Sequence, residues 1–284
     1  MLKGEKSTGP DPYTMPGYRI YWNQKFLEAA MQKKKIKSNI LLGCCVILAV
    51  VAAGFYAKKY VSVNSTVNGR ELPIYSVDTG EKKVALSFDA AWGNEDTREL
   101  LDILKKHQVH VTFFMTGGWV EKYPEDVKAI LAAGHDLGNH SENHKNMSQL
   151  SEEEIKSELM KVHDRVKELT GYDMFLFRPP YGDYDNEVIE TARACGYYPI
   201  QWSVDSLDWK DYGADDIIRQ VCDSENLTGG AIILCHNGAK YTADALDAML
   251  TELKEKGYEV VPVSELIIRN NYHMDPAGRQ IPDN

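Results

Sequence analysis

Short apolar runs alternate with amphipathic helical patterns from residue 84 to residue 263, and this alternation limits the folds open to the chain more than any other feature. Strands that alternate with helices pair in parallel, because each helix carries the chain back across the sheet. Seven such repeats predict an α/β fold whose parallel sheet closes into a barrel. The expected strands are residues 84–89, 109–115, 136–140, 175–178, 198–204, 231–236 and 259–263. The expected helices are residues 95–107, 124–133, 151–169, 186–194, 214–223 and 243–256.

The repeats form one domain, since no stretch rich in Pro, Gly or Ser after residue 72 is long enough to divide them. We expect the domain over residues 72–270, and we expect it to be monomeric. Residues 58–71 are polar and are predicted to be a linker, and residues 271–284 are predicted to be a C-terminal tail.

Residues 40–57 read ILLGCCVILAVVAAGFYA, a run of 18 residues without a charged side chain. As a helix this run would be about 27 Å long, close to the hydrocarbon thickness of a bilayer. Four lysines between positions 33 and 37 precede it, so the positive-inside rule places the N-terminus in the cytoplasm. The alternative is a cleaved signal peptide, but residues 1–39 are too long for the basic region of one. The sequence therefore predicts a basic cytoplasmic tail, one transmembrane anchor and an extracytoplasmic domain at the cell membrane.

The charge is divided unevenly along the chain. Residues 1–39 carry a net charge of +5, whereas residues 60–284 carry −17. A domain with this excess of carboxylates repels phosphate backbones, so the composition argues against a nucleic-acid partner.

Five polar or titratable residues stand where predicted strands end. Parallel barrels place the carboxyl ends of their strands at one mouth, so side chains at these positions converge. A single histidine or aspartate there is usually a satisfied core group, but five in phase with the repeat indicate a functional site. The five residues are Asp89, His140, Arg178, Asp205 and His236.

These residue types suit hydrolysis of an amide or ester without a serine or cysteine nucleophile. His140 and His144 are four residues apart, so on a helix they would share one face and could hold a metal ion. Asp89 could act as a base toward a water molecule, and His236 could act as an acid from across the mouth. The remaining two strand-end groups could set the pKa values of this pair.

Five motifs follow one another along the chain: SFDAAWG (87–93), HSENH (140–144), RPPYG (178–182), DSLDW (205–209) and ILCH (233–236). In this order they resemble the polysaccharide deacetylases, which are the carbohydrate esterase family 4 or NodB-homology enzymes. The resemblance covers residues 84–266, and its closest form is the PdaB-like sporulation branch. It implies a deformed (β/α)7-type barrel and a hydrolase that removes acetyl groups from N-acetyl sugars of glycans.

The resemblance also implies roles for individual residues. Asp89 matches the catalytic base and His236 the catalytic acid. Arg178 matches the arginine that orients the base, and Asp205 the carboxylate that tunes the acid. The backbone N–H of Tyr181 is expected to help hold the oxyanion.

For the metal and the substrate, the resemblance implies a divalent cation (Zn²⁺, Co²⁺ or Mn²⁺) held by His140 and His144. Trp209 and Leu234 match the apolar walls around the acetyl methyl group. One position departs from the family, because Ala90 stands where a second aspartate usually completes the metal site. Losing this carboxylate lowers the expected metal affinity, and either of two nearby acids, Glu95 or Asp96, could replace it or simply complement a helix N-terminus.

The sequence thus predicts a membrane-anchored enzyme that deacetylates GlcNAc or MurNAc residues of peptidoglycan in the cell wall or spore cortex. The alternative is a glycan-binding or assembly protein that kept the groove and lost the metal. The alanine at position 90 favours this alternative, whereas an intact acid–base pair favours the enzyme, since binding alone needs no such pair.

Overall fold

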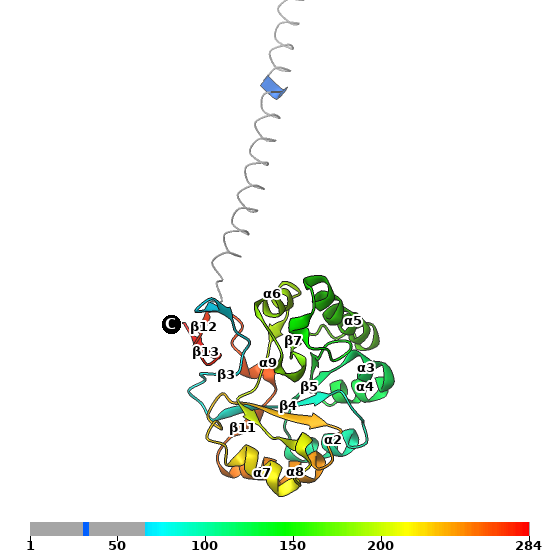
Figure 1. Ribbon diagram of the computed structural model, residues 1–284, viewed down its shortest axis with the longest axis vertical. Coiled ribbons are helices and arrows are strands. Elements are labelled where there is room, and N and C mark those ends of the chain that lie inside the picture. The colour runs from blue at the N-terminus through cyan, green and yellow to red at the C-terminus, as the bar shows by residue number, and fades with distance from the viewer. Residues whose placement is uncertain (1–30, 34–65, 284) are drawn as a thin grey trace, which may run out of the picture. The chain divides into compact units, whose positions relative to one another are not determined.

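The computed structural model describes residues 31–33 and 66–283 (Figure 1). Residues 66–283 belong to one compact unit, Val63–Asn284, and the short helical stretch 31–33 belongs to another. In these described ranges no helix is both long and apolar enough to cross a membrane. The predicted anchor, residues 40–57, lies outside them, as does most of the predicted cytoplasmic tail.

A curled parallel sheet forms the centre of the domain, with helices around its outside (Figure 1). Its strands follow the order β8-β7-β6-β5-β4-β10-β9. A further strand, β11, pairs with the first residues of β4, on the same side of β4 as β5, which pairs with its last residues. The strands are β4 (Lys83–Ala90), β5 (Thr112–Met115), β6 (Asp136–Asn139), β7 (Leu176–Phe177), β8 (Tyr198–Pro199), β9 (Val204–Asp205), β10 (Ile232–Asn237) and β11 (Glu259–Val261).

All six predicted helices are present, with ends within two residues of the expected ones. They are α2 (Thr97–His107), α4 (Pro124–Ala132), α5 (Glu152–Thr170), α6 (Asn186–Ala194), α7 (Ala214–Cys222) and α8 (Thr242–Glu255). The longest, α5, begins with a reciprocal capping box between Ser151 and Glu154 and ends at Gly171, which adopts a left-handed conformation. Two short helices were not predicted: α3 (Gly117–Lys122), with Thr116 as its N-cap, and α9 (Val263–Leu266).

Alternation along β4 divides the core into two layers. Val84, Leu86, Phe88 and Ala90 lie in the large apolar cluster that the outer helices cover. The intervening residues face the inside of the curled sheet, where a second apolar cluster forms around Ala85 and its neighbours. This alternation places Asp89 on the inner face, at the carboxyl end of the strand.

The sheet does not close into a complete barrel. Residues 198–204 were predicted to form one strand, and this prediction is wrong. These residues form two short strands, β8 and β9, at opposite ends of the sheet. Between them the chain leaves β7 and crosses toward β10: the Gln201 N–H donates to the Ile74 carbonyl, and the Ser203 N–H donates to the Ile232 carbonyl. The segment around Ile74 fills the gap through a bridge to Ile200.

Both ends of the domain contribute to a second, three-stranded sheet, where the structure differs from the predicted tail. β12 (Tyr272–Met274) and β13 (Arg279–Pro282) form an antiparallel pair, and β13 lies parallel to β3 (Ser76–Val77). Tyr272 and Met274 are buried on one side of β12, which explains why this segment packs on the domain. Part of the predicted linker is also ordered, as the pair β1 (Thr66–Val67) and β2 (Arg70–Glu71).

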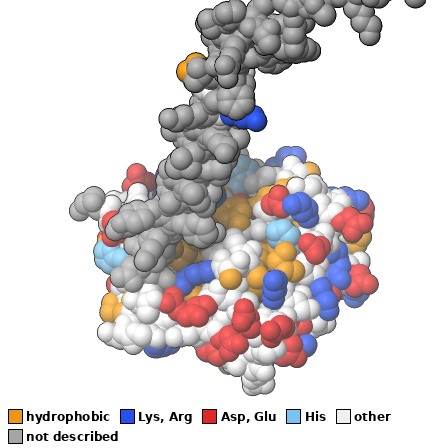
Figure 2. Space-filling view, turned by 90° about the horizontal axis from the view of Figure 1, so that it is seen from above, with side chains coloured by type: hydrophobic (Ala, Val, Ile, Leu, Met, Phe, Trp, Pro, Cys, Tyr) orange, Lys and Arg blue, Asp and Glu red, His pale blue; other side chains and the backbone are white. Residues whose placement is uncertain are grey.

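The surface carries charges of both signs. Figure 2 shows Asp and Glu side chains along the rim of the face it presents, with Lys and Arg between them.

Gly230 packs closely against Val77 of the N-terminal segment. Its φ is +88°, and a Cβ added there would lie 1.6 Å from the carbonyl oxygen of Val77. Gly196 has the same φ with nothing within 4 Å, so it is a matched control. We expect Gly196→Ala to lower the free energy of unfolding by about 1–2 kcal/mol through backbone strain alone. Gly230→Ala should cost about 3 kcal/mol or more, as measured by urea denaturation, and equal losses would contradict this close contact.

Candidate active site

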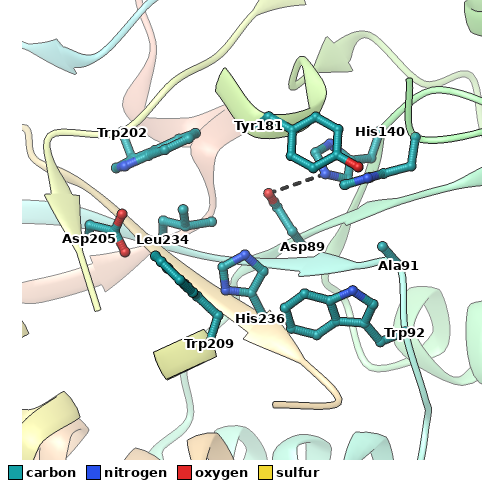
Figure 3. Close-up of a pocket in the computed structure, with 11 residues that line it drawn as sticks. Asp89, Ala91, Trp92, His140, Tyr181, Trp202, Asp205, Trp209, Leu234 and His236 are labelled. Carbon is teal, nitrogen blue, oxygen red and sulfur yellow. Dashed lines mark ion pairs between the residues drawn. The ribbon is translucent and has the colours of Figure 1, made fainter. Parts of the chain in front are cut away.

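Side chains from several strand ends surround one pocket of about 440 Å³ (Figure 3). Asp89, His140 and His236 line this pocket together, as predicted from the sequence. Arg178 does not line it but forms an ion pair with Asp89. The lining residues are Asp89, Ala91, Trp92, His140, His144, Tyr181, Trp202, Asp205, Trp209, Leu234 and His236.

Arg178 holds Asp89 in place from below. The arginine is completely buried, and its Nη1 donates to Asp89 Oδ1 at 2.7 Å. Its Nη2 donates to Ser87 Oγ at 2.9 Å, and its guanidinium lies 4.2 Å from the centre of the Phe114 ring. Burial alone would raise the pKa of Asp89, but Arg178 and the neighbouring histidines outweigh it and hold that pKa below its ordinary value. Asp89 is therefore a carboxylate at neutral pH.

The Nε2 atom of His140 faces the carboxylate of Asp89. Its Nδ1 lies 2.8 Å from the carbonyl oxygen of Arg178, which can only accept, so Nδ1 carries the proton. Its Nε2 lies 3.4 Å from Asp89 Oδ2. Burial lowers the pKa of His140 to about 4, and burial also lowers the pKa of His144. Both imidazoles are thus neutral at pH 7, with ring centres 4.9 Å apart.

The two histidines do not lie on a helix. Ser141 and His144 both have positive φ angles, so the chain turns instead of forming a helix, and the turn brings the two rings together. Side chains of α5 hold this loop: Glu158 accepts from the N–H of Asn143, and Arg165 pairs with Glu142 through two hydrogen bonds of 2.8 Å.

His236 has a different carboxylate partner from the one that the resemblance implied. Its Nδ1 lies 2.6 Å from Oδ1 of Asp208, whose Oδ2 accepts from the His236 N–H and from Thr242 Oγ1. Asp205 instead accepts from the Leu207 N–H. Burial alone would lower the pKa of His236, but Asp208, Asp89 and Asp205 together raise it above its ordinary value. Asp208 was not predicted as a site residue, although it stands beside Trp209 in the DSLDW motif.

The residues present do not complete a metal site with three protein ligands. Among the described residues, no group of three or more His, Cys, Asp or Glu side chains is placed to hold a metal ion. The side chain of Ala90 is buried in the apolar layer under the helices, and Ala91 lines the pocket instead. Neither Glu95 nor Asp96, the two candidates for the third metal ligand, lines the pocket. Asp96 accepts from the N–H of Gly238, and Glu95 is exposed.

Aromatic rings form much of the pocket wall. Tyr181, Trp209 and Leu234 line it, as the resemblance implied, and Tyr181 has a φ of 60°. Trp92 and Trp202, neither of which was predicted to have a role, also line it. Three of the exposed large apolar side chains of residues 66–283 line this mouth, those of Trp92, Tyr181 and Trp209, whereas the exposed Tyr212 does not.

Replacing Asp208 by Asn should lower the pKa of His236. An opposite charge within hydrogen-bond distance raises the pKa of a histidine, and its removal is expected to lower that pKa by about 1–3 pH units. Asp205→Asn is the matched control, because Asp205 lies near the same imidazole without bonding to it. NMR titration of the imidazole in both variants measures the effect, and a larger drop in the Asp205 variant would reverse the assignment.

Comparison with known proteins agrees with the resemblance found in the sequence. A family model described as "Polysaccharide deacetylase" matches residues 76–200. The chain is 34% identical over 208 residues to the peptidoglycan-N-acetylmuramic acid deacetylase PdaA of Bacillus subtilis, covering 70% of this chain and 77% of PdaA. It is 39% identical over 215 residues to the peptidoglycan-N-acetylglucosamine deacetylase PgdA of Listeria monocytogenes, covering 73% of this chain but only 45% of PgdA.

A solved structure has the same fold. BA3943 of Bacillus anthracis, described as a CE4 family pseudoenzyme, is 36% identical, with a TM-score of 0.66 over 74% of this chain and 70% of that one. Sequence, fold and the ordered strand-end residues together show that this chain belongs to the polysaccharide deacetylase family of carbohydrate esterases.

Proposed function

We propose that this protein hydrolyses the acetamido group of GlcNAc or MurNAc residues in peptidoglycan. The observation that carries the proposal is geometric: a carboxylate and an imidazole line the same pocket, Asp89 bonded to Arg178 and His236 bonded to Asp208. A base that is ionised and an acid that is protonated at the same pH are what amide hydrolysis requires. Relatives such as PdaA and PgdA bear the names of peptidoglycan deacetylases, which supports the substrate class.

In this reaction Asp89 accepts a proton from a water molecule, whose oxygen attacks the acetamido carbonyl. The carbonyl oxygen becomes an oxyanion, toward which the backbone N–H of Tyr181 is proposed to donate. His236 then gives its proton to the sugar nitrogen as the carbon–nitrogen bond breaks. The products are acetate and a free amino sugar. Trp209 and Leu234 offer apolar surface to the acetyl methyl group.

The same pair predicts a bell-shaped dependence of the rate on pH. The rate should fall as the pH rises through the raised pKa of His236, because the acid then loses its proton. It should also fall as the pH drops through the lowered pKa of Asp89, because the base becomes protonated. A rate profile from pH 3 to pH 10 tests this, and a rate that keeps rising to pH 10 would contradict the role of His236.

A second candidate function is glycan binding without turnover. The observation that favours it is the incomplete donor set, in which two imidazoles face the pocket with no third ligand in the described residues. The similar BA3943 is described as a pseudoenzyme, and a mutant of it is described as having restored enzymatic activity.

One experiment separates the two functions. The purified full chain is incubated with N-acetylated peptidoglycan strands, without added metal and with Zn²⁺, Co²⁺ or Mn²⁺, while acetate release and strand binding are measured. Acetate release that Asp89→Asn abolishes supports the enzyme. Binding without acetate release under every condition supports the binding protein.

We also propose that residues 40–57 anchor the chain in the cell membrane with the domain outside. The support is the charge-free apolar run and the lysines before it. An anchor would hold the pocket near a substrate that is itself immobile. Fractionation and protease treatment of intact cells test this, and a domain that resists protease until the cells are lysed would overturn it. Assignment to the PdaB-like sporulation branch stays a prediction.

A further inference from the structure

Trp92 lies face to face with the imidazole of His236. The ring centres are 5.0 Å apart and the planes differ by 18° (Figure 3). The indole comes from the loop after β4, whereas His236 is on β10, so the contact joins two neighbouring strand ends. Trp92 is also 48% exposed, which is unusual for a tryptophan in a domain with a large apolar core.

The loop that carries Trp92 is fixed against the segment that follows His236. The Nε1–H of Trp119 donates to the Gly93 carbonyl at 3.0 Å. Gly238 has a φ of +87°, and a Cβ there would lie 3.0 Å from the Gly93 nitrogen, so the two backbones touch. Asp96 accepts from the Gly238 N–H with both carboxylate oxygens, at 2.9 and 3.0 Å. These contacts set the position of the indole before any ligand arrives.

The His236 imidazole is thus held by two different groups. Asp208 fixes it in its plane through the 2.6 Å contact at Nδ1, but a single hydrogen bond leaves the ring free to rock about that contact. A stacked indole removes this freedom, because tilting the imidazole would separate the two faces. It also covers one face of the ring and so restricts the approach of water to the bond with Asp208.

We propose that Trp92 is a positioning residue for His236, which fixes the plane of the imidazole so that its Nε2 points into the pocket. The inference rests on the proposed function in assigning the acid step to His236. Small errors in the placement of a proton donor reduce turnover more than binding, because the donor is needed only as the carbon–nitrogen bond breaks.

The test compares Trp92→Ala, Trp92→Leu and Trp92→Phe in the full chain. The charged groups around the imidazole, Asp208, Asp89 and Asp205, belong to other elements and are unchanged in all three variants. Tyr212→Ala is the matched control, since Tyr212 is a 71% exposed aromatic residue outside the pocket lining.

The first measurement needs no turnover. A protonated Nδ1 bonded to a carboxylate gives a proton NMR signal far downfield, assigned here by its loss in His236→Gln. We expect this signal to disappear through exchange with water in Trp92→Ala, to weaken in Trp92→Leu, and to persist in Trp92→Phe and Tyr212→Ala. A signal of wild-type intensity in Trp92→Ala would overturn the proposal.

The second measurement is kinetic. With N-acetylated glycan strands, Trp92→Ala should lower kcat about 10- to 100-fold with little change in KM, and Trp92→Phe should restore most of kcat. A rise in KM alone, with an unchanged NMR signal, would show that Trp92 only contacts sugar and would overturn the proposal. If the wild type releases no acetate but the NMR signal still depends on Trp92, the proposed hydrolysis fails while the positioning role stands.

Discussion

Asp89→Asn is expected to reduce acetate release by about 10²–10⁴-fold, because an amide cannot accept the proton of the attacking water. The substitution should also destabilise the fold, since it leaves the fully buried Arg178 without its anionic partner. Removing one member of a buried ion pair costs about 3–5 kcal/mol, so we expect a lower urea midpoint as well as lost turnover.

His236→Gln provides the contrast to this variant. It removes the proposed acid, so turnover should fall to a similar extent. Its stability should change much less, because Asp208 still accepts from Thr242 and from the backbone N–H of residue 236. Activity and urea denaturation measured on both variants separate the two effects. Wild-type rates in either variant would contradict its proposed role, and an unchanged midpoint for Asp89→Asn would contradict the buried pair.

Arg178→Met should be among the most destabilising single substitutions in the domain, by about 3–5 kcal/mol. It leaves the Asp89 carboxylate buried without its cation and removes the guanidinium that lies over the Phe114 ring. The double variant Asp89→Asn/Arg178→Met contains neither charge and should be more stable than Arg178→Met alone. A double-mutant cycle by urea denaturation measures this coupling. Additive losses, with no recovery in the double variant, would show that the ion pair contributes little.

Much of the site could be predicted because it depends on the strand repeat. Asp89, His140, Arg178 and His236 each end or follow an apolar run, and parallel pairing brings such positions to one edge. The pattern of buried and polar residues is visible in the sequence, so these side chains could be found from it.

The errors fall where loops, not strands, decide the geometry. In DSLDW, Leu207 adopts a left-handed conformation, and this turn directs Asp208 and not Asp205 to the acid. Two residues with positive φ likewise set the shape of the histidine loop. Non-glycine residues rarely adopt such angles, and their local sequence does not reveal them.

The break in the expected fifth strand has a similar origin. Residues 198–204 have a strand-like sequence, but their backbone hydrogen bonds go to three separate parts of the chain, namely residues 175–177, Ile74 and Ile232. Tertiary contacts of this kind override local strand propensity. The same holds for the segment 271–284, where β12 and β13 have a partner, β3, that lies far away in the sequence.

The pairing of β3 with β13 has a consequence for the order in which the protein can fold. Ser76 is synthesised about 200 residues before its partner Arg279. At roughly 5–20 residues per second, a ribosome needs about 10–40 s to make the intervening chain. During that time the N-terminal strand has no β13 to pair with, and its free edge is open to other chains. The contact between the two ends of the domain can therefore form only after residue 279 has been synthesised, so this small sheet is completed late.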